Sequence, residues 1–250
     1  MMSRIDPDRI ANLRDSADLS HEGPVLRRGQ LLRSGHLHQA DRADLDALFD
    51  AGVRRVIDFR DDTERERAPS PHWPDVETEH RSIRDPEFNI DRLIERVMNR
   101  ETAEVDLPRQ IREAYARFPY SHTRSLSAPA RALLEESGAV LVHCTAGKDR
   151  TGLSVALVQL AVGVSYDRVL SHYLASTKYL ADTNSIRIRT LAAALPDPEW
   201  IVPALEVRAE YLDAALESII TTDGSIGGYL ERWEMTDEDW ARLRSRMVIG

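Results

Sequence analysis

Cysteine is the scarcest residue in this chain of 250, which contains Cys144 and no second thiol. A framework of internal disulfides is therefore excluded, and a single free thiol suits a reducing compartment. No stretch approaches the roughly 20 consecutive apolar residues that a membrane-spanning helix requires, so stable membrane insertion is not expected. Residues 1–8 are polar and lack the apolar core of a signal peptide. We therefore expect a cytoplasmic protein, and export without a signal peptide stays open.

The chain also has fewer positive than negative side chains. The 33 basic residues are outnumbered by 42 acidic ones, which gives a formal net charge of −9. Because a protein that binds nucleic acid usually presents a basic face, we expect no nucleic acid among its partners. The histidines, the cysteine and the carboxylates form no group with the spacing of metal ligands. The sequence therefore predicts neither a metal site nor a cofactor.

The most informative stretch is residues 143–152, which read HCTAGKDRTG. A short apolar run at 139–142 precedes it and is typical of a buried strand in a parallel sheet. Residues 153–162 follow it, are apolar almost all round and predict a buried helix. The stretch is therefore expected to form a tight loop between a strand and a helix N-terminus. Such a loop can surround one tetrahedral anion with its backbone N–H groups.

The side chains of this loop have the chemistry of phosphate transfer. Amides, a helix N-terminus and Arg150 all favour the thiolate of Cys144, which is the nucleophilic form of a cysteine. The guanidinium of Arg150 can hold two phosphate oxygens at once, and the Thr151 hydroxyl can donate to the sulfur as it leaves. Gly147 and Gly152 permit a close turn. This context favours a catalytic cysteine over a merely buried one at the end of a strand.

The order His-Cys, five residues, then Arg-Thr resembles the signature of the cysteine-dependent protein tyrosine phosphatases. With Ala-Gly-Lys-Asp inside the loop, it is similar to the bacterial branch with tyrosine and dual specificity, some of whose members also accept phosphoinositides. The resemblance extends weakly to residues 12–15, 33–35 and 58–60. It implies an α/β fold, in which helices flank a central, mostly parallel sheet. The alternation of predicted helices with a few apolar strands along the chain favours the same fold class. It also implies a set of substrate-binding residues: Thr145, Ala146, Gly147, Lys148, Thr151 and Arg60.

A phosphatase of this kind needs an acid for the leaving oxygen, and two aspartates compete for that role. Asp149 lies inside the loop, where the bacterial branch also has an aspartate, and a carboxylate beside a bound dianion tends to hold a proton. Asp58 lies near the end of a strand predicted at 53–60, so it is expected on the same sheet edge as Cys144. We predict that Asp149 is the acid and keep Asp58 as the alternative catalytic residue. A salt bridge from Asp58 to Arg60 at the strand end is the purely structural interpretation.

No repeat, low-complexity tract or clear linker divides the chain, so we predict a single domain over residues 1–250. The segment 85–120 leaves the pattern of core strands and has apolar residues at helical spacing at 93–98 and 111–118. It is either a crossover or a helical, lid-like insertion that covers the site, and we favour the lid. The mixed charges of 61–67 predict a solvated turn and a short helix.

Local patterns predict a few further elements. Residues 25–33 alternate loosely around a glycine, which suggests a small hairpin. Asp41 is expected to cap a helix that ends at Gly52. Thr236, followed by an aspartate three residues later, is expected to open the last helix.

The predicted function is removal of phosphate from phosphotyrosine proteins through a cysteinyl-phosphate intermediate, with phosphoserine and phosphothreonine left open. Phosphoinositides are the alternative substrates, because Lys148 can contact a second phosphate as a flexible point charge. Two other classes remain in view. A sulfurtransferase has a similar cysteine loop but no need of Arg150 and Thr151, and a non-catalytic phosphopeptide-binding module normally lacks the nucleophile. The sequence does not specify the oligomeric state.

Overall fold

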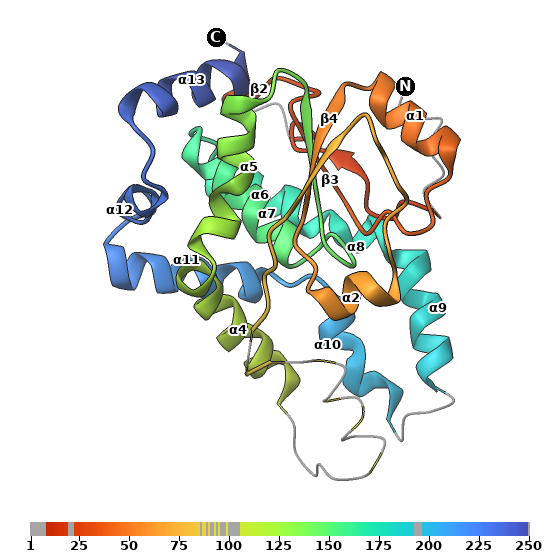
Figure 1. Ribbon diagram of the computed structural model, residues 1–250. Helices are drawn as coiled ribbons and strands as arrows, with labels where there is room; N and C mark the ends of the chain where they lie inside the picture. The colour runs from red at the N-terminus through yellow and green to blue at the C-terminus, as the bar shows by residue number, and fades with distance from the viewer. Residues whose placement is uncertain are drawn as a thin grey trace.

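Helices cover both faces of a central sheet in the computed structural model (Figure 1). The structure describes residues 9–19, 23–85, 87–88, 90, 93, 95, 99, 106–192 and 197–249. Its strands are β1 (Arg14–Asp15), β2 (Val25–Leu26), β3 (Leu31–Ser34), β4 (Val53–Asp58), β5 (Glu77–His80), β6 (Ala139–His143) and β7 (Val248–Ile249). Its α-helices are α1 (Arg42–Asp50), α2 (Asp62–Arg67), α4 (Leu107–Ser121), α5 (Thr123–Glu135), α6 (Arg150–Ala161), α7 (Tyr166–Leu174), α8 (Ser176–Tyr179), α9 (Ala181–Ala192), α10 (Val202–Leu205), α11 (Ala209–Asp223), α12 (Ile226–Leu230) and α13 (Asp237–Met247). Two short 3₁₀ helices, η2 (Pro198–Ile201) and η3 (Glu231–Trp233), complete the set.

The central sheet has five strands in the order β1–β3–β6–β4–β5. Strands β3, β6, β4 and β5 are parallel, and β1 pairs antiparallel with β3 at one edge. β6 lies in the middle of the sheet, and all of its residues are buried, as a strand covered on both faces requires. The predicted α/β fold with a mostly parallel sheet is confirmed.

The two faces of β6 contribute to two different parts of the hydrophobic core. Val140 and Val142 pack in the larger cluster, to which α4, α5, α6, α7 and α11 contribute. Ala139 and Leu141 pack in the smaller cluster, which includes buried side chains of α1. Successive side chains of a strand point to opposite faces, so a slip of one residue would exchange the two sets. Burial on both faces therefore fixes the register of β6 and the position of the loop that follows it.

The capped helices form as predicted, and the hairpin does not. Asp41 caps α1 and Thr236 caps α13, each with a reciprocal hydrogen bond to the aspartate three residues later. The hairpin expected at 25–33 is wrong, because β2 pairs with β7 and β3 pairs with β1 and β6. Every residue of β3 is buried, so this strand belongs to the centre of the sheet and is not available to β2.

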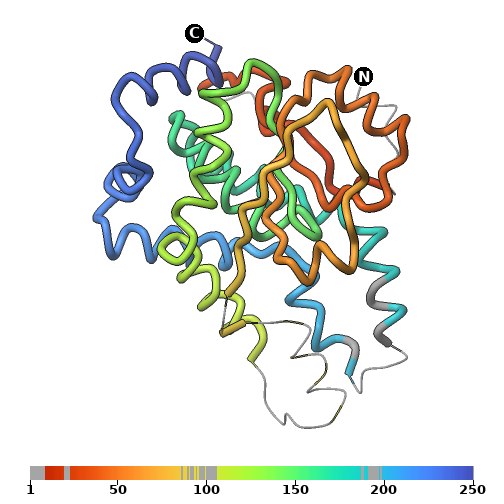
Figure 2. The backbone as a smooth tube through the Cα atoms, in the orientation of Figure 1, coloured from red at the N-terminus to blue at the C-terminus, as the bar shows by residue number. Residues whose placement is uncertain are grey.

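Part of the segment 85–120 forms the helix predicted at 111–118, now seen as α4. α4 packs against α11, and Figure 2 shows the two helices side by side. The other helix, predicted at 93–98, falls largely outside the described residues. The lid-like role of the segment remains a prediction. Over the described ranges, none of the helices is both long and apolar enough to cross a membrane.

Candidate active site

The loop that carries Cys144 joins the end of the central strand β6 to the first turn of α6, as the sequence predicts. Cys144 is 2% exposed and lines a cavity of about 380 Å³. The parallel strands on both sides of β6 end at the same edge of the sheet, so the cavity opens where an α/β fold presents its binding sites.

Close packing against the end of β3 gives the loop its shape. Gly147 has a φ of +69°, and a Cβ atom there would lie 2.1 Å from the carbonyl oxygen of Ser34. At Gly152 a Cβ atom would lie 2.8 Å from the ring of Tyr173. Both positions therefore require glycine, one for its conformation and its lack of a side chain, the other for space.

The carbonyl groups of the loop point outward, toward donors from the N-terminal part of the chain. The backbone N–H of His36 donates to the carbonyl of Thr145 at 3.1 Å. Nδ2 of Asn12 donates to the next two carbonyls at 3.1 and 2.9 Å, and Nη2 of Arg33 reaches the second of these at 2.7 Å. In a trans peptide unit the N–H points away from the carbonyl. The amides of these units therefore face the inside of the loop, where an anion can bind them.

Arg150 is held by Glu64, a residue of α2. Nη1 and Nη2 of Arg150 each donate to one carboxylate oxygen of Glu64 at 2.6 Å, and the Thr145 hydroxyl donates to the same carboxylate. Glu64 also accepts from the backbone N–H of Asp61 at 2.9 Å, as part of a capping box. Burial alone would raise the pKa of Glu64, but the bonds from Arg150 outweigh it and lower this pKa to about 2. Burial would lower the pKa of Arg150, but the hydrogen bonds to Glu64 and the nearby negative charges outweigh it and raise this pKa.

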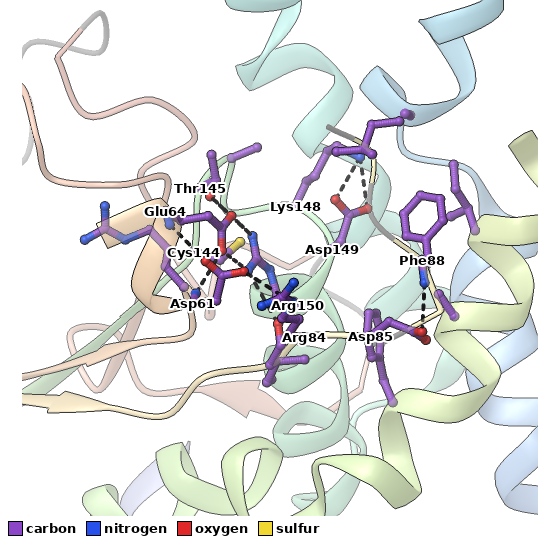
Figure 3. Close-up of a pocket in the computed structure, with 18 of the residues that line it drawn as sticks. Asp61, Glu64, Arg84, Asp85, Phe88, Cys144, Thr145, Lys148, Asp149 and Arg150 are labelled. Atoms are coloured by element: carbon purple, nitrogen blue, oxygen red, sulfur yellow. Dashed lines mark hydrogen bonds and ion pairs between the residues drawn. The ribbon is translucent and has the colours of Figure 1, made fainter. Parts of the chain in front are cut away.

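The interpretation of 61–67 as a solvated run is wrong for Glu64. The segment does form the expected short helix, but Glu64 points from it toward Cys144 and Arg150 (Figure 3). Asp61, followed three residues later by a glutamate, is a capping-box pattern in the sequence and identifies the start of the helix. Nothing local indicates that its glutamate meets an arginine 86 residues away.

Asp149 lies on the opposite side of Cys144 from Glu64, in the wall of the cavity (Figure 3). Nζ of Lys148 donates to its carboxylate at 2.9 Å, and the hydroxyl of Tyr115 donates to it at 2.8 Å. Lys148 is buried and also donates to the carbonyl of Glu206, so its ammonium group is directed at Asp149. Burial, followed by the nearby charge of Asp149, raises the pKa of Tyr115 well above its usual value. The Tyr115 hydroxyl therefore remains a donor at neutral pH.

Asp58 and Arg60 form a buried pair beside the loop. Asp58 is 3% exposed, and three hydrogen bonds of 2.7–3.1 Å join its carboxylate to the side chain of Arg60. Arg60 also donates to the carbonyl of Ala68 and contributes to the cavity wall, whereas Asp58 is absent from the described residues that line it. Burial would raise the pKa of Asp58, but the hydrogen bond from Arg60 outweighs it and the pKa is lowered. This geometry matches the structural interpretation of the pair.

Thr151 does not make the bond that the sequence suggested. Its side chain is fully buried at the start of α6, and its hydroxyl has no hydrogen-bond partner among the described residues. The predicted contact with the sulfur of Cys144 is therefore not present in this structure. His143, which precedes Cys144, is also buried, and burial lowers its pKa to about 4, so its ring is neutral at pH 7.

The cavity has a charged end and an apolar wall. Cys144, Arg150 and Asp149 lie at the charged end. The apolar wall is formed by α4 and by neighbouring segments of the chain, with the side chains of Ile83, Phe88, Ile90, Ile111, Ala114, Phe118 and Ala204. No group of three or more His, Cys, Asp or Glu side chains in the described ranges could hold a metal ion. One partly apolar cavity therefore contains a thiol, inward-facing amides, an arginine paired with a glutamate, and a carboxylate.

Sequence comparison shows that most of the chain is similar to tyrosine phosphatases. The sequence profile of the tyrosine phosphatase family matches residues 5–249. A Cupriavidus necator protein, named provisionally as a tyrosine-protein phosphatase, is 32% identical over 97% of this chain and 88% of its own length. The triple specificity protein phosphatase PtpB of Mycobacterium tuberculosis is 32% identical over 95% of this chain and 96% of its own. The crystal structure of TpbA from P. aeruginosa matches 71% of this chain and 91% of its own at 18% identity, with a TM-score of 0.34.

Proposed function

Because the chain belongs to the tyrosine phosphatase family, we propose that it hydrolyses phosphotyrosine in proteins through a cysteinyl-phosphate intermediate on Cys144. One observation carries this proposal. Cys144 follows the central strand at the opening of a loop whose carbonyls at Thr145, Ala146 and Gly147 are held outward, so that the amides of these peptide units face inward beside Arg150. An anion with three free oxygens suits such a ring, and the thiol lies at its entrance.

Two displacement steps follow from this arrangement. The thiolate of Cys144 attacks phosphorus, the bond to the tyrosyl oxygen breaks, and Asp149 gives that oxygen its proton. Water then attacks the phosphocysteine, the Asp149 carboxylate takes a proton from the water, and the S–P bond breaks to release inorganic phosphate. Asp149 is preferred to Asp58 for this role because it lines the cavity, whereas the carboxylate of Asp58 is buried against Arg60.

Arg150 has the donors to follow the phosphoryl group through both steps. Glu64 uses one N–H from each terminal nitrogen of the guanidinium, and five N–H donors are present in all. The other contacts of the terminal nitrogens of Arg150 are long, at 3.3 Å to the Thr145 hydroxyl and at 3.4 and 3.5 Å to the carbonyls of Phe59 and Ile83. Phosphate oxygens can therefore replace these weak partners while Glu64 keeps the group in place. The Glu64 carboxylate is itself fixed by Asp61 and Thr145, so we assign it the role of a positioning residue.

The apolar wall supports phosphotyrosine as the substrate. A tyrosyl ring extends the phosphate several ångströms from the peptide and presents an apolar face, which side chains such as Ile111 and Phe118 can cover. Phosphoserine and phosphothreonine have no ring to fill this space, so we propose that they are poorer substrates. Phosphoinositides are the second candidate. Arg67 and Arg84 also line the cavity, and basic side chains near the loop suit a second phosphate. Arg84 forms a long ion pair with Asp61 at 3.8 Å, and Lys148 is held by Asp149 at 2.9 Å.

The test compares matched substrates on one enzyme. Hydrolysis of a phosphotyrosine peptide is measured beside the same peptide with phosphoserine or phosphothreonine and beside vesicles with monophosphorylated phosphoinositides. We expect the largest kcat/KM for phosphotyrosine, and a covalent phosphoenzyme after an acid quench that disappears in Cys144→Ser. Faster hydrolysis of the lipids would make phosphoinositides the substrate class. Binding of the peptides without turnover would indicate a non-catalytic module, and transfer of sulfur from thiosulfate would indicate a sulfurtransferase.

A further inference from the structure

The side chain of Arg33 is buried directly beneath the loop. Arg33 lies on β3, beside Val142 of the central strand, and it is 0% exposed. Its Nη2 donates to the carbonyls of Gly147 at 2.7 Å and Lys148 at 3.4 Å. Nε and Nη1 of the same guanidinium make no hydrogen bond to the described residues. Arg33 is therefore a buried cation whose strongest contact is with the loop itself.

The surroundings of Arg33 provide no direct negative partner. Its remaining contact is with the Ser176 hydroxyl at 3.5 Å, and none of the carboxylates in the described ranges forms an ion pair with it. The next buried cation is Arg14, which donates to Ser176 and to the carbonyls of Asn12 and His172. Burial, followed by repulsion from Arg33, lowers the pKa of Arg14 to about 8. Two cations therefore lie behind the loop with neutral groups as their bonded partners.

An unpaired charge in a protein interior is costly, so such groups normally face an opposite charge. For Arg33, the opposite charge can come from the other side of the loop, where the sulfur of Cys144 lies and where the loop can bind an oxyanion. Burial lowers the pKa of Arg33 to about 10, and the charge of Cys144 is the largest influence that opposes this effect. The guanidinium of Arg33 contacts the outer side of the loop backbone, and the anion site lies on the inner side of the same backbone.

We infer that Arg33 is a positioning residue for the phosphate loop: it holds the carbonyls of Gly147 and Lys148 outward, and its unpaired charge is balanced by the oxyanion that the loop binds. The inference rests on the proposed function, because it assigns the loop to phosphate. The outward carbonyls turn the amides of the two following residues inward. Asn12 assists as a neutral donor to the same loop, at the carbonyls of Ala146 and Gly147.

The test measures the affinity of inorganic phosphate in the Cys144→Ser background, by calorimetry, so that no turnover is required. Arg33→Met removes both the donors and the charge, and Arg33→Lys keeps the charge. Asn12→Ala removes neutral donors to the loop, together with the side-chain oxygen that accepts from Arg14, and leaves the charge of Arg33 in place. Gln159→Met is the matched control. Gln159 is fully buried at the far end of α6 and donates to the carbonyl of Ser16, so its loss costs a buried hydrogen bond without a loop contact. Thermal unfolding is recorded for every variant.

We expect Arg33→Met to weaken phosphate binding by about 10- to 100-fold, the range of a lost charge-assisted hydrogen bond. Arg33→Lys should recover part of this loss, and Gln159→Met should leave the affinity unchanged. The loss in Arg33→Met should be larger above the second ionisation of phosphate than below it, because a dianion interacts more strongly with the missing charge. The loss in Asn12→Ala should depend less on this ionisation.

Equal affinity in Arg33→Met and the parent protein would overturn the inference. So would a loss that tracks unfolding temperature alone and also occurs in Gln159→Met. If Arg33→Met does not fold, Arg33→Gln takes its place, because glutamine keeps side-chain N–H donors and removes the charge. A loss of affinity in Arg33→Gln that is no larger for the phosphate dianion than for the monoanion would then overturn the inference. Failure of the unsubstituted enzyme to hydrolyse phosphotyrosine would count against the proposed function and would leave these binding results to stand on their own.

Discussion

Cys144 is the residue on which the proposed chemistry depends. We expect Cys144→Ser to lose at least ~10³-fold in kcat, because a catalytic unit without its nucleophile keeps only its binding and electrostatic contributions. The inward amides and Arg150 are unchanged by this substitution, so phosphate and vanadate should still bind. Steady-state kinetics and calorimetry measure the two effects separately. Turnover close to that of the unsubstituted enzyme would contradict the covalent step.

Asp149 and Asp58 differ in a way that a pair of substrates can detect. Asp149→Asn should slow a poor leaving group, such as a tyrosyl or alkyl oxygen, by about 10²–10⁴-fold, the usual contribution of general acid catalysis. A good leaving group such as p-nitrophenolate should lose much less. The basic limb of the pH–rate profile should also disappear, because the group that must be protonated is gone.

Asp58→Asn is the matched control for this prediction. It should slow both leaving groups by a similar and smaller factor, since Asp58 acts on the site through the buried Arg60 pair. The basic limb of its profile should persist. The reverse pattern in the two variants would assign the acid to Asp58 and leave Asp149 with a role in loop shape.

Sequence reasoning works at the residue scale where the chemistry is local. Cys144, Gly147 and Arg150 lie within one strand–loop–helix unit, and their spacing alone predicts a loop that can surround an anion. The roles of Tyr115 and Glu64 cannot be predicted in this way, because each residue contacts the loop only through the tertiary fold. Tyr115 has a further difficulty, since an aromatic residue at helical spacing is equally typical of a core position.

At the scale of elements, α2 connects a surface helix to the catalytic loop through Glu64. We expect Glu64→Gln to reduce stability at pH 7 by about 1–3 kcal/mol, the range for a partly buried hydrogen bond to a charged group. The pKa of Glu64 in the folded protein is about 2, below its ordinary value near 4.5. Its contribution is therefore complete above pH 4.5 and is lost as the pH falls toward 2. Urea unfolding between pH 7 and pH 2 should show the stability difference shrinking over this range.

Glu66→Gln provides the control on the same helix, because Glu66 is exposed. It should change stability little at any pH. The kinetics of Glu64→Gln also decide how the residue acts. A fall in kcat/KM agrees with a positioning role for Glu64, whereas tighter phosphate binding would show that its carboxylate competes with the substrate for Arg150.

Elements are predictable from sequence when their boundaries carry their own signals. The capping pairs of α1 and α13 are of this kind, and so is the apolar run of β6. β2 is not, since its partner β7 is the last strand of the chain and no local pattern connects the two. The loose alternation over residues 25–33 is compatible with pairing of β2 to β3 or to β7. The burial of β3 in the central sheet leaves β7 as the partner of β2.

For the molecule as a whole, we expect activity to survive a strong chelator such as EDTA. The positive charge that a metal would supply to phosphate is present in Arg150 and in the inward amides of the loop. Hydrolysis of a phosphotyrosine peptide with and without the chelator measures this, with an added divalent ion as the control. Complete loss of activity that magnesium or zinc restores would contradict it.

The architecture was predictable from the alternation of helices with a few apolar strands, which is typical of an α/β fold. The order of the strands was not, because β6 is the last strand of the central sheet along the chain and yet its middle strand in space. That inversion brings the segment around Asn12 and Arg33 against a loop more than 100 residues away. Weak motif matches at 12–15 and 33–35 hinted at this proximity without giving its geometry.

The single thiol of this chain also determines how it responds to an oxidant. A sulfenic acid formed at Cys144 by peroxide finds no second cysteine in the chain with which to condense. No internal disulfide can therefore protect the sulfur, and further peroxide would carry it to the sulfinic acid, which ordinary thiols do not reduce. Recovery of the reduced enzyme then depends on a thiol supplied from outside, such as glutathione, reaching the bottom of the cavity before the second oxidation does.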